Sequence, residues 1–315
     1  MRRFIIKGPN KDIRGEVNIS GAKNCCLPLM AASILFKNKV ILKNVPFVKD
    51  VITMKDLLVS LGSKVEFSES SKTITITNKK KHKLVVPYKL VSTMRAGVLT
   101  MGSLLGRYQK EKIKVALGGG CALGVRDTSW HLAGFKSLGA DNDLDKGYVN
   151  ISSKKGLKGG KYTFPKVTVT GTSNLIMASV LGKGTHFIKN ISIEPEVIDL
   201  IYFLNNSGAD IKFLGKRSIK VKGVKELINA KHTIIGDRIE AFSYLCVGAI
   251  TNKQIKVNNI NPKFLRTEIG ILKKIGYKIG INSNSILLSP AKKLNSVKIK
   301  TGPWPAFATD NMPII

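Results

Sequence analysis

The sequence has little of what marks several common protein classes. Aromatic residues make up only 7% of it, and 20 acidic residues stand against 52 basic ones, which gives a formal net charge of +32. The four cysteines, Cys25, Cys26, Cys121 and Cys246, include no pair with metal-site spacing. The longest apolar stretch, Leu27–Phe36, is too short to span a bilayer, and the apolar part of the basic N-terminus is too brief for a signal peptide. We therefore expect a cytoplasmic protein with no membrane partner.

Arginine is also scarce, and this scarcity affects how the positive net charge is interpreted. Only nine of the 52 basic residues are arginine, and the lysines are scattered along the chain. Arginine is the preferred residue for bidentate phosphate and base contacts, so a nucleic-acid-binding protein is supported by net charge alone. We expect no nucleic-acid partner. Compositional drift toward Lys, Asn and Ile explains the charge at least as well as a nucleic-acid partner does. The positive field would also favour an anionic substrate.

What the chain does contain is an internal repeat. Each predicted helix has an apolar stripe and ends at a glycine, which alternating strand sequence follows. These glycines, 77, 69 and 68 positions apart, are Gly62, Gly139, Gly208 and Gly276. The period indicates α/β units of about 70 residues, each a strand, helix, strand, helix and hairpin. A fifth unit is predicted to open with a strand at Val297–Lys300. We interpret its end at Ile315 as truncation; a natural short tail is the alternative.

One loop combines glycines with a thiol and a cation. Gly118–Gly120 precede Cys121, and Arg126 follows five residues later. Glycine permits left-handed backbone conformations, so this stretch predicts a loop in which the thiol is accessible. A nearby cation favours the reactive thiolate. The alternative is a flexible surface turn in which the cysteine has no role.

Six ordered motifs together resemble the enolpyruvyl transferase family. They are Ile19–Asn24, Thr93–Ala96, Gly119–Arg126, Glu194–Val197, Gly236–Glu240 and Pro305–Asp310. The resemblance covers the whole chain and implies two domains, each an inside-out α/β barrel of three repeated βαβαββ units. The first domain is expected at residues 21–231. Residues 1–20 with 232–315 are expected to form the second, which would be incomplete.

The resemblance also implies a reaction. The branch that it matches best transfers the enolpyruvyl group of phosphoenolpyruvate to the 3′-hydroxyl of UDP-N-acetylglucosamine and releases phosphate, without cofactor or metal. Cys121 matches the residue that protonates the methylene carbon of phosphoenolpyruvate, and Asp310 matches the proposed base at the sugar hydroxyl. Substrate contacts are implied for Lys23, Asn24, Arg95, Arg126 and His131. A structural histidine is the alternative for His131.

Two segments depart from the family pattern. The uridine-binding turn, which normally carries Pro and Asp, reads Asp127, Thr128, Ser129 and Trp130. The diphosphate-side segment includes Lys166, Thr168 and Val169. Thr168 replaces the usual Ser and keeps a hydroxyl, whereas Thr170 replaces a Gly and predicts a less close backbone approach.

Three other functions are alternatives to this reaction. Within the same fold, the shikimate-pathway enolpyruvyl transferase is the second candidate. A truncated, non-catalytic remnant of the family is the third, and a basic nucleic-acid-binding protein is the fourth. The family's arginine for the phosphoenolpyruvate carboxylate lies past Ile315, so we expect little transfer by the chain as written.

Overall fold

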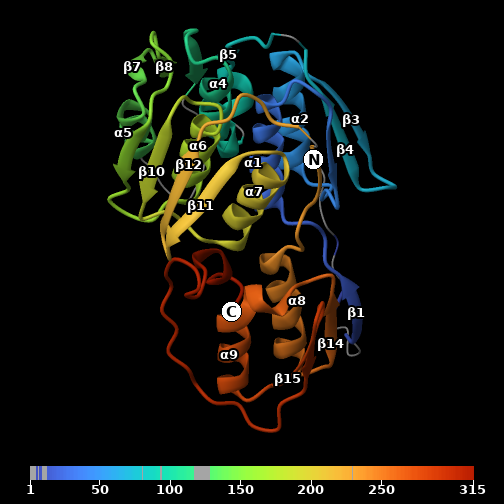
Figure 1. Cartoon of the computed structure of the whole chain (residues 1–315). Helices are drawn as coiled ribbons and strands as arrows, with labels where there is room; N and C mark the ends of the chain where they lie inside the picture. The colour runs from blue at the N-terminus through green and yellow to red at the C-terminus, as the bar shows by residue number, and fades with distance from the viewer. Residues whose placement is uncertain are drawn as a thin grey trace. The chain divides into compact units, whose positions relative to one another are not determined.

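A computed structural model gives the fold of the chain and describes residues 5, 7–8, 13–79, 81–92, 94–116, 128–228 and 230–315 (Figure 1). For Arg95 the structure describes the backbone and not the side chain. The chain divides into two compact units. The large unit comprises Gly21–Ile235, and the small unit comprises Met1–Ser20 together with Gly236–Ile315.

The four sheets of the described residues share one topology. In each, an outer strand runs parallel to its neighbour, and an antiparallel hairpin completes the sheet. The large unit holds the sheets β13-β2-β4-β3, β5-β6-β8-β7 and β9-β10-β12-β11, and the small unit holds β1-β14-β16-β15. The predicted α/β repeat is thus present four times in these residues. The sheets remain separate, so the described fold is not a closed barrel.

The strands of the large unit are β2 (Val40–Lys43), β3 (Lys64–Ser68), β4 (Thr73–Thr77), β5 (Val85–Val86), β6 (Ile113–Ala116), β7 (Asp141–Asp145), β8 (Tyr148–Ser152), β9 (Gly160–Thr163), β10 (Thr185–Lys189), β11 (Asp210–Gly215), β12 (Ser218–Lys222) and β13 (Lys231–Thr233). Those of the small unit are β1 (Gly15–Asn18), β14 (Ile255–Asn258), β15 (Lys278–Asn282) and β16 (Ser285–Ser289).

The four striped helices predicted from the sequence are present. They are α2 (Lys49–Leu61), α5 (Ser129–Ser137), α7 (Pro195–Asn206) and α9 (Arg266–Ile275). The four glycines that follow them all have positive φ, from 93° at Gly139 to 126° at Gly276. Such a residue ends a helix by turning the backbone left-handed, which glycine does without steric penalty. The fourth helix differs in its start, because Pro262 opens a 3₁₀ turn, η3 (Pro262–Leu265), before α9.

A second set of helices includes those that fill the interior of the large unit. It consists of α1 (Lys23–Ala32) with η1 (Ser33–Leu35), α3 (Tyr88–Val91), η2 (Arg95–Leu99) with α4 (Thr100–Arg107), and α6 (Val169–Ser179). The short α3 is partly exposed, whereas nearly every residue of α1, α4 and α6 is buried, and none of these three helices carries an acidic side chain. Figure 1 shows the hairpins placed around them. In the described part of the chain, no helix has the length and apolar character that a membrane span requires.

Two glycines allow α4 and α6 to approach closely. A Cβ atom on Gly102 would lie 2.3 Å from the carbonyl oxygen of Asn174, and one on Gly106 would lie 2.5 Å from that of Met177. Both distances are too short for any side chain. The backbones of the two helices therefore touch, and the Gly102 N–H donates a hydrogen bond of 2.8 Å to Asn174 Oδ1.

The small unit has its own core. Its remaining elements are α8 (Arg238–Thr251) and η4 (Thr309–Asn311). Phe242 of α8 packs edge-on against Phe307, with ring centroids 5.7 Å apart, among the apolar residues of β14 and β16. Asp237 caps α8, because its Oδ1 accepts a hydrogen bond from the Ile239 N–H at 2.8 Å.

The predicted strand at Val297–Lys300 is wrong. Residues 290–300 form no helix or strand, and the next β pairing is an isolated bridge between Thr301 and Phe307. The segment alternates apolar and polar residues as a strand does. A strand is stabilised by pairing, however, and none of the described strands pairs with this segment.

The glycine at the end of α9 offers a matched pair of variants. Gly276→Ala should lower the free energy of unfolding by about 2 kcal/mol, because an alanine resists positive φ and its Cβ would lie 2.3 Å from the Lys293 carbonyl oxygen. Gly270→Ala, inside the same helix with no atom near the new Cβ, should raise it by about 0.5–1 kcal/mol. Urea unfolding of the full chain measures both. Equal changes in the free energy of unfolding would contradict the conclusion that Gly276 ends α9 through its left-handed conformation.

Candidate functional site

The first turn of α1 presents two of the predicted substrate-binding residues. Lys23 and Asn24 are its first residues, Asn24 is exposed, and the N-cap residue Ala22 makes no side-chain capping bond. Lys23 Nζ lies 3.1 Å from Asp50 Oδ2 of α2, and both side chains are partly exposed. An ion pair this exposed contributes little stability, so a bound anion could replace Asp50 at small cost. An uncapped helix start with a lysine suits an anionic ligand.

His131 of α5 is buried and held by the N-terminal half of α6. The Nδ2 of Asn174 donates hydrogen bonds to His131 Nδ1 at 2.9 Å and to the Val98 carbonyl oxygen at 3.1 Å. Asn174 Oδ1 accepts from Gly102, so the orientation of the amide is fixed. Nδ1 must then accept, which leaves the proton on Nε2, 3.4 Å from Thr170 Oγ1.

The structure brings the two departing segments together. Thr168 is the N-cap residue of α6, and its hydroxyl accepts a hydrogen bond from the Gly171 N–H at 3.3 Å. Lys166 and Val169, on either side of this cap, are exposed. Thr128 and Ser129 begin α5, which contacts α6. The Trp130 carbonyl oxygen accepts from the Tyr162 hydroxyl of β9 at 3.0 Å. The starts of α5 and α6 therefore form one cluster, anchored from β9.

Four predicted residues cannot be located. Cys121, Arg126, Asp127 and the side chain of Arg95 lie outside the described residues. The backbone segment that carries Arg95, η2, contacts both α1 and α6. It thereby connects the turn of Lys23 with the cluster around His131.

Asp310, the predicted base, belongs to the small unit. It is exposed on η4, and the next residue, Asn311, is fully buried and donates a hydrogen bond of 3.0 Å to Glu268 Oε1. Burial raises the pKa of Glu268, while Arg238 and the hydrogen bond from Asn311 act in the opposite direction. The carboxylate of Glu268 thus anchors the turn that presents Asp310.

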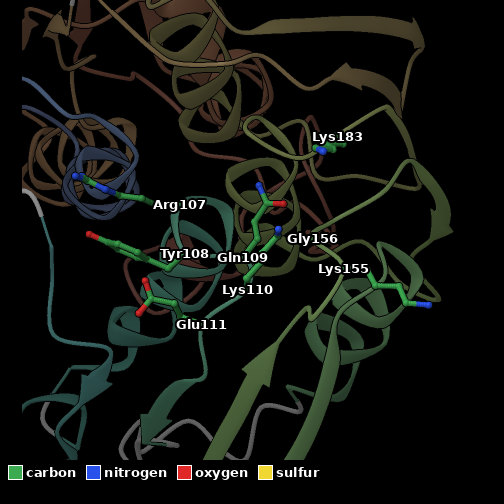
Figure 2. Close-up of a pocket in the computed structure, with 8 residues that line it drawn as sticks. All are labelled: Arg107, Tyr108, Gln109, Lys110, Glu111, Lys155, Gly156 and Lys183. Atoms are coloured by element: carbon green, nitrogen blue, oxygen red, sulfur yellow. The ribbon is translucent and has the colours of Figure 1, made fainter.

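A basic cavity of about 280 Å³ lies elsewhere in the large unit, and no predicted site residue lines it. Figure 2 shows that Arg107 and Lys155 at its two sides point away from each other. The guanidinium of Arg107 is also engaged, because it donates to the carbonyl oxygens of Ile34 at 2.7 Å and Phe36 at 2.6 Å. The cations of this cavity do not converge on one ligand position.

Sequence reasoning missed the residues that hold the site residues in place. Asp50 was not identified as the partner of Lys23. Asn174 lies in a helix whose residues are all small, hydroxyl-bearing or apolar apart from it, and its amide was the available signal. Glu268 gave no signal, because a glutamate in the first turn of α9 is ordinary helix chemistry.

The fold is that of the enolpyruvyl transferases. The chain is similar to the enolpyruvyl transferase NikO of Streptomyces tendae, with a TM-score of 0.82 over 95% of this chain and 71% of that one, at 17% identity. It is also similar to an EPSP synthase of Acinetobacter baumannii, with a TM-score of 0.69 over 92% of this chain and 67% of that one, at 19% identity. At such identities the likeness concerns the fold alone.

Sequence similarity is more specific. The profile of the family EPSP synthase (3-phosphoshikimate 1-carboxyvinyltransferase) matches residues 7–314. The UDP-N-acetylglucosamine 1-carboxyvinyltransferase of Pelagibacter ubique is 44% identical over 98% of this chain and 73% of its own length. The enzymes of that name from Helicobacter pylori strain Shi470 and Rickettsia prowazekii are 42% and 41% identical over 95% and 98% of this chain, and over 70% and 74% of their own lengths. The chain belongs to this EPSP synthase family and is by family a transferase.

The described thiols should be poorly reactive. Burial raises the pKa of Cys246 to about 11, and it also raises the pKa values of the fully buried Cys25 and Cys26. At pH 8 only about one Cys246 thiol in a thousand is ionised, and its alkylation rate should rise about tenfold per pH unit up to pH 11. Cys121, by the sequence-based prediction, should be labelled first.

Alkylation of the folded chain followed by peptide mapping tests this order. The Cys121→Ser variant is the control and should lose the fast label. Labelling of Cys246 at pH 8 as fast as that of Cys121 would contradict the prediction.

Proposed function

We propose that the chain binds phosphoenolpyruvate and UDP-N-acetylglucosamine and transfers the enolpyruvyl group to the 3′-hydroxyl of the sugar, with release of phosphate. The observation that carries this proposal is the 44% identity, along 98% of the chain, to an enzyme named for that transfer. The shikimate-pathway alternative has less support, because the similar EPSP synthase shares only 19% identity. The proposal includes a role in peptidoglycan synthesis in the cytoplasm.

Phosphoenolpyruvate is a compact polyanion, so its binding needs concentrated positive charge. Lys23 supplies an ammonium at the start of α1, where the positive end of the helix dipole also attracts anions. In the proposed site Arg126 and Arg95 add two guanidinium groups, and Asn24 contributes a neutral amide beside Lys23. Asp50 holds the Lys23 ammonium, 3.1 Å away, until the phosphate replaces it.

The proposed chemistry requires one proton donor and one proton acceptor. Cys121 gives its thiol proton to the methylene carbon of phosphoenolpyruvate, which makes C2 electrophilic. Asp310 accepts the proton of the 3′-hydroxyl as the sugar oxygen bonds to C2. Phosphate then leaves from C2 while the new methyl group returns a proton to the Cys121 thiolate, which restores the carbon–carbon double bond of the enolpyruvyl group. Asp310 is exposed and can receive a proton, and the hydrogen bond between Asn311 and Glu268 keeps its turn ordered.

The nucleotide sugar is proposed to bind at the cluster of α5 and α6. Its contacts are proposed for Asp127, Thr128, Ser129 and Trp130 on the uridine side, and for Lys166, Thr168 and Val169 on the diphosphate side. Lys166 is exposed beside the start of α6, where free N–H groups attract phosphate oxygens. His131 keeps its proton on Nε2 and is a neutral donor, which suits a supporting contact to an anion or to Thr170.

Substitution of Lys23 tests the anion site. Lys23→Met should weaken phosphoenolpyruvate binding by about 10-fold to 100-fold, because it removes a charge-assisted contact. Lys154→Met is the control: it removes the same charge from an exposed loop of the large unit and should leave binding unchanged. Calorimetric titration with UDP-N-acetylglucosamine present measures both.

Equal affinities of the two variants would remove Lys23 from the proposed site, and no binding of either substrate by the unmodified chain would overturn the function. Transfer is measured as phosphate release that depends on UDP-N-acetylglucosamine and is lost in Cys121→Ala. Robust release of this kind would contradict the sequence-based expectation of little turnover.

A further inference from the structure

A thiol, a carboxylate and an imidazole meet in the interior beside the first turn of α1. The Cys25 thiol donates a hydrogen bond of 2.6 Å to Asp199 Oδ2. His232 Nε2 lies 3.0 Å from the same oxygen, an ion-pair distance without the alignment of a hydrogen bond. Cys25 and Asp199 are buried, and only 12% of the His232 side chain is exposed. A carboxylate is costly to bury unless donors or cations hold it, so Asp199 needs an explanation.

The thiol of Cys25 is a hydrogen-bond donor and not a nucleophile. Burial raises its pKa well above the usual value, and the charge of Asp199, its hydrogen bond and the charge of Glu196 raise the pKa further. The thiol therefore stays protonated at neutral pH and keeps its proton on the bond to Asp199. Covalent chemistry at Cys25 is excluded by the same argument.

His232 is itself fixed from two directions. It lies in β13, where it pairs with Leu42 of β2. Its ring packs edge-on against Phe203, with centroids 5.5 Å apart, and Phe203 follows Asp199 by one turn of α7. Figure 1 shows α7 beside α1, and the two helices are in contact. One face of α7 thus places both the carboxylate of Asp199 and the aromatic support of its imidazole partner.

Two tethers flank Lys23 and Asn24. On one side the Ala22 N–H donates a hydrogen bond of 2.8 Å to the carbonyl oxygen of Ile235, three residues after His232. On the other side Cys25 is bound to Asp199. Between them, Asn24 is exposed and Lys23 reaches the partly exposed Asp50. The direction in which Lys23 and Asn24 point is therefore set by the residues on either side of them.

We propose that Asp199, supported by His232, is a positioning residue: through Cys25 it holds the turn Lys23–Asn24 in the orientation that receives the substrate phosphate. This inference rests on the proposed function, because it assigns the turn to phosphoenolpyruvate. Asp199 touches no substrate itself. Its effect on binding passes through one hydrogen bond to the residue next to Asn24.

Substitutions at Cys25 test the inference, with the adjacent Cys26 as matched control. Both cysteines are fully buried in α1, and the pKa of Cys26 is raised by burial alone. Cys25→Ala should weaken phosphoenolpyruvate binding about tenfold, whereas Cys25→Ser keeps a donor and should restore binding to within about twofold. Cys26→Ala should lower the melting temperature to a similar degree and leave the dissociation constant unchanged. In an Asp199→Asn background, Cys25→Ala should change binding less than twofold, because the charged acceptor is already gone.

Equal dissociation constants for Cys25→Ala and Cys26→Ala, or failure of Cys25→Ser to restore binding, would overturn the inference. Hydrogen exchange over residues 19–27 provides a second readout that needs no substrate. Exchange there should speed up about tenfold in Cys25→Ala and return to the original rate in Cys25→Ser. An unmodified chain that does not bind phosphoenolpyruvate would refute the assignment to that substrate and the proposed function together. The exchange rates would still show whether Cys25 holds the turn, and unchanged rates would refute that step as well.

Discussion

The contact between α4 and α6 is the constraint on which the large unit depends. Gly102 and Gly106 let the two backbones touch, and no larger residue fits at either position. The same contact places Asn174 where it bonds to both Gly102 and His131. The close packing of the two helices therefore also fixes the orientation of His131, a candidate ligand-binding residue. A change that separated the helices would also release the imidazole.

Each of three predicted site residues, or its neighbour in the chain, is hydrogen-bonded to a buried polar side chain. Asn174 bonds to His131 directly, Asp199 bonds to the neighbour of Asn24, and Glu268 bonds to the neighbour of Asp310. In each case the anchoring group is buried while the anchored segment faces outward, except at His131. A buried polar group must be hydrogen-bonded, which restricts it to a narrow range of positions. The exposed residue beside it is then restricted in position as well. Rigid anchors inside and polar groups outside suit the binding of a small, highly charged substrate.

Local patterns could be predicted from the sequence, and long-range pairings could not. The glycines that end α2, α5, α7 and α9 were identified because helix stripes and stop signals lie within about a dozen residues. Val297–Lys300 has a strand's alternation, but whether it pairs depends on other parts of the chain. The bond between Cys25 and Asp199 joins residues 174 positions apart, and no periodicity encodes it. The motifs located Lys23 and Asp310; their supports, Asp199 and Glu268, required the fold.

The parallel pairing of β13 with β2 has a consequence for synthesis of the chain. The strands that complete this first sheet are separated by about 190 residues, as the bond from Asn44 to the Ile234 carbonyl oxygen also illustrates. At roughly 5–20 residues per second, β2 leaves the ribosome about 10–40 s before its parallel neighbour exists. During that interval its edge exposes unpaired N–H and C=O groups. This sheet is thus the first of the large unit to begin and the last to close, so the nascent chain keeps an open strand edge until the residues of β13 have been made.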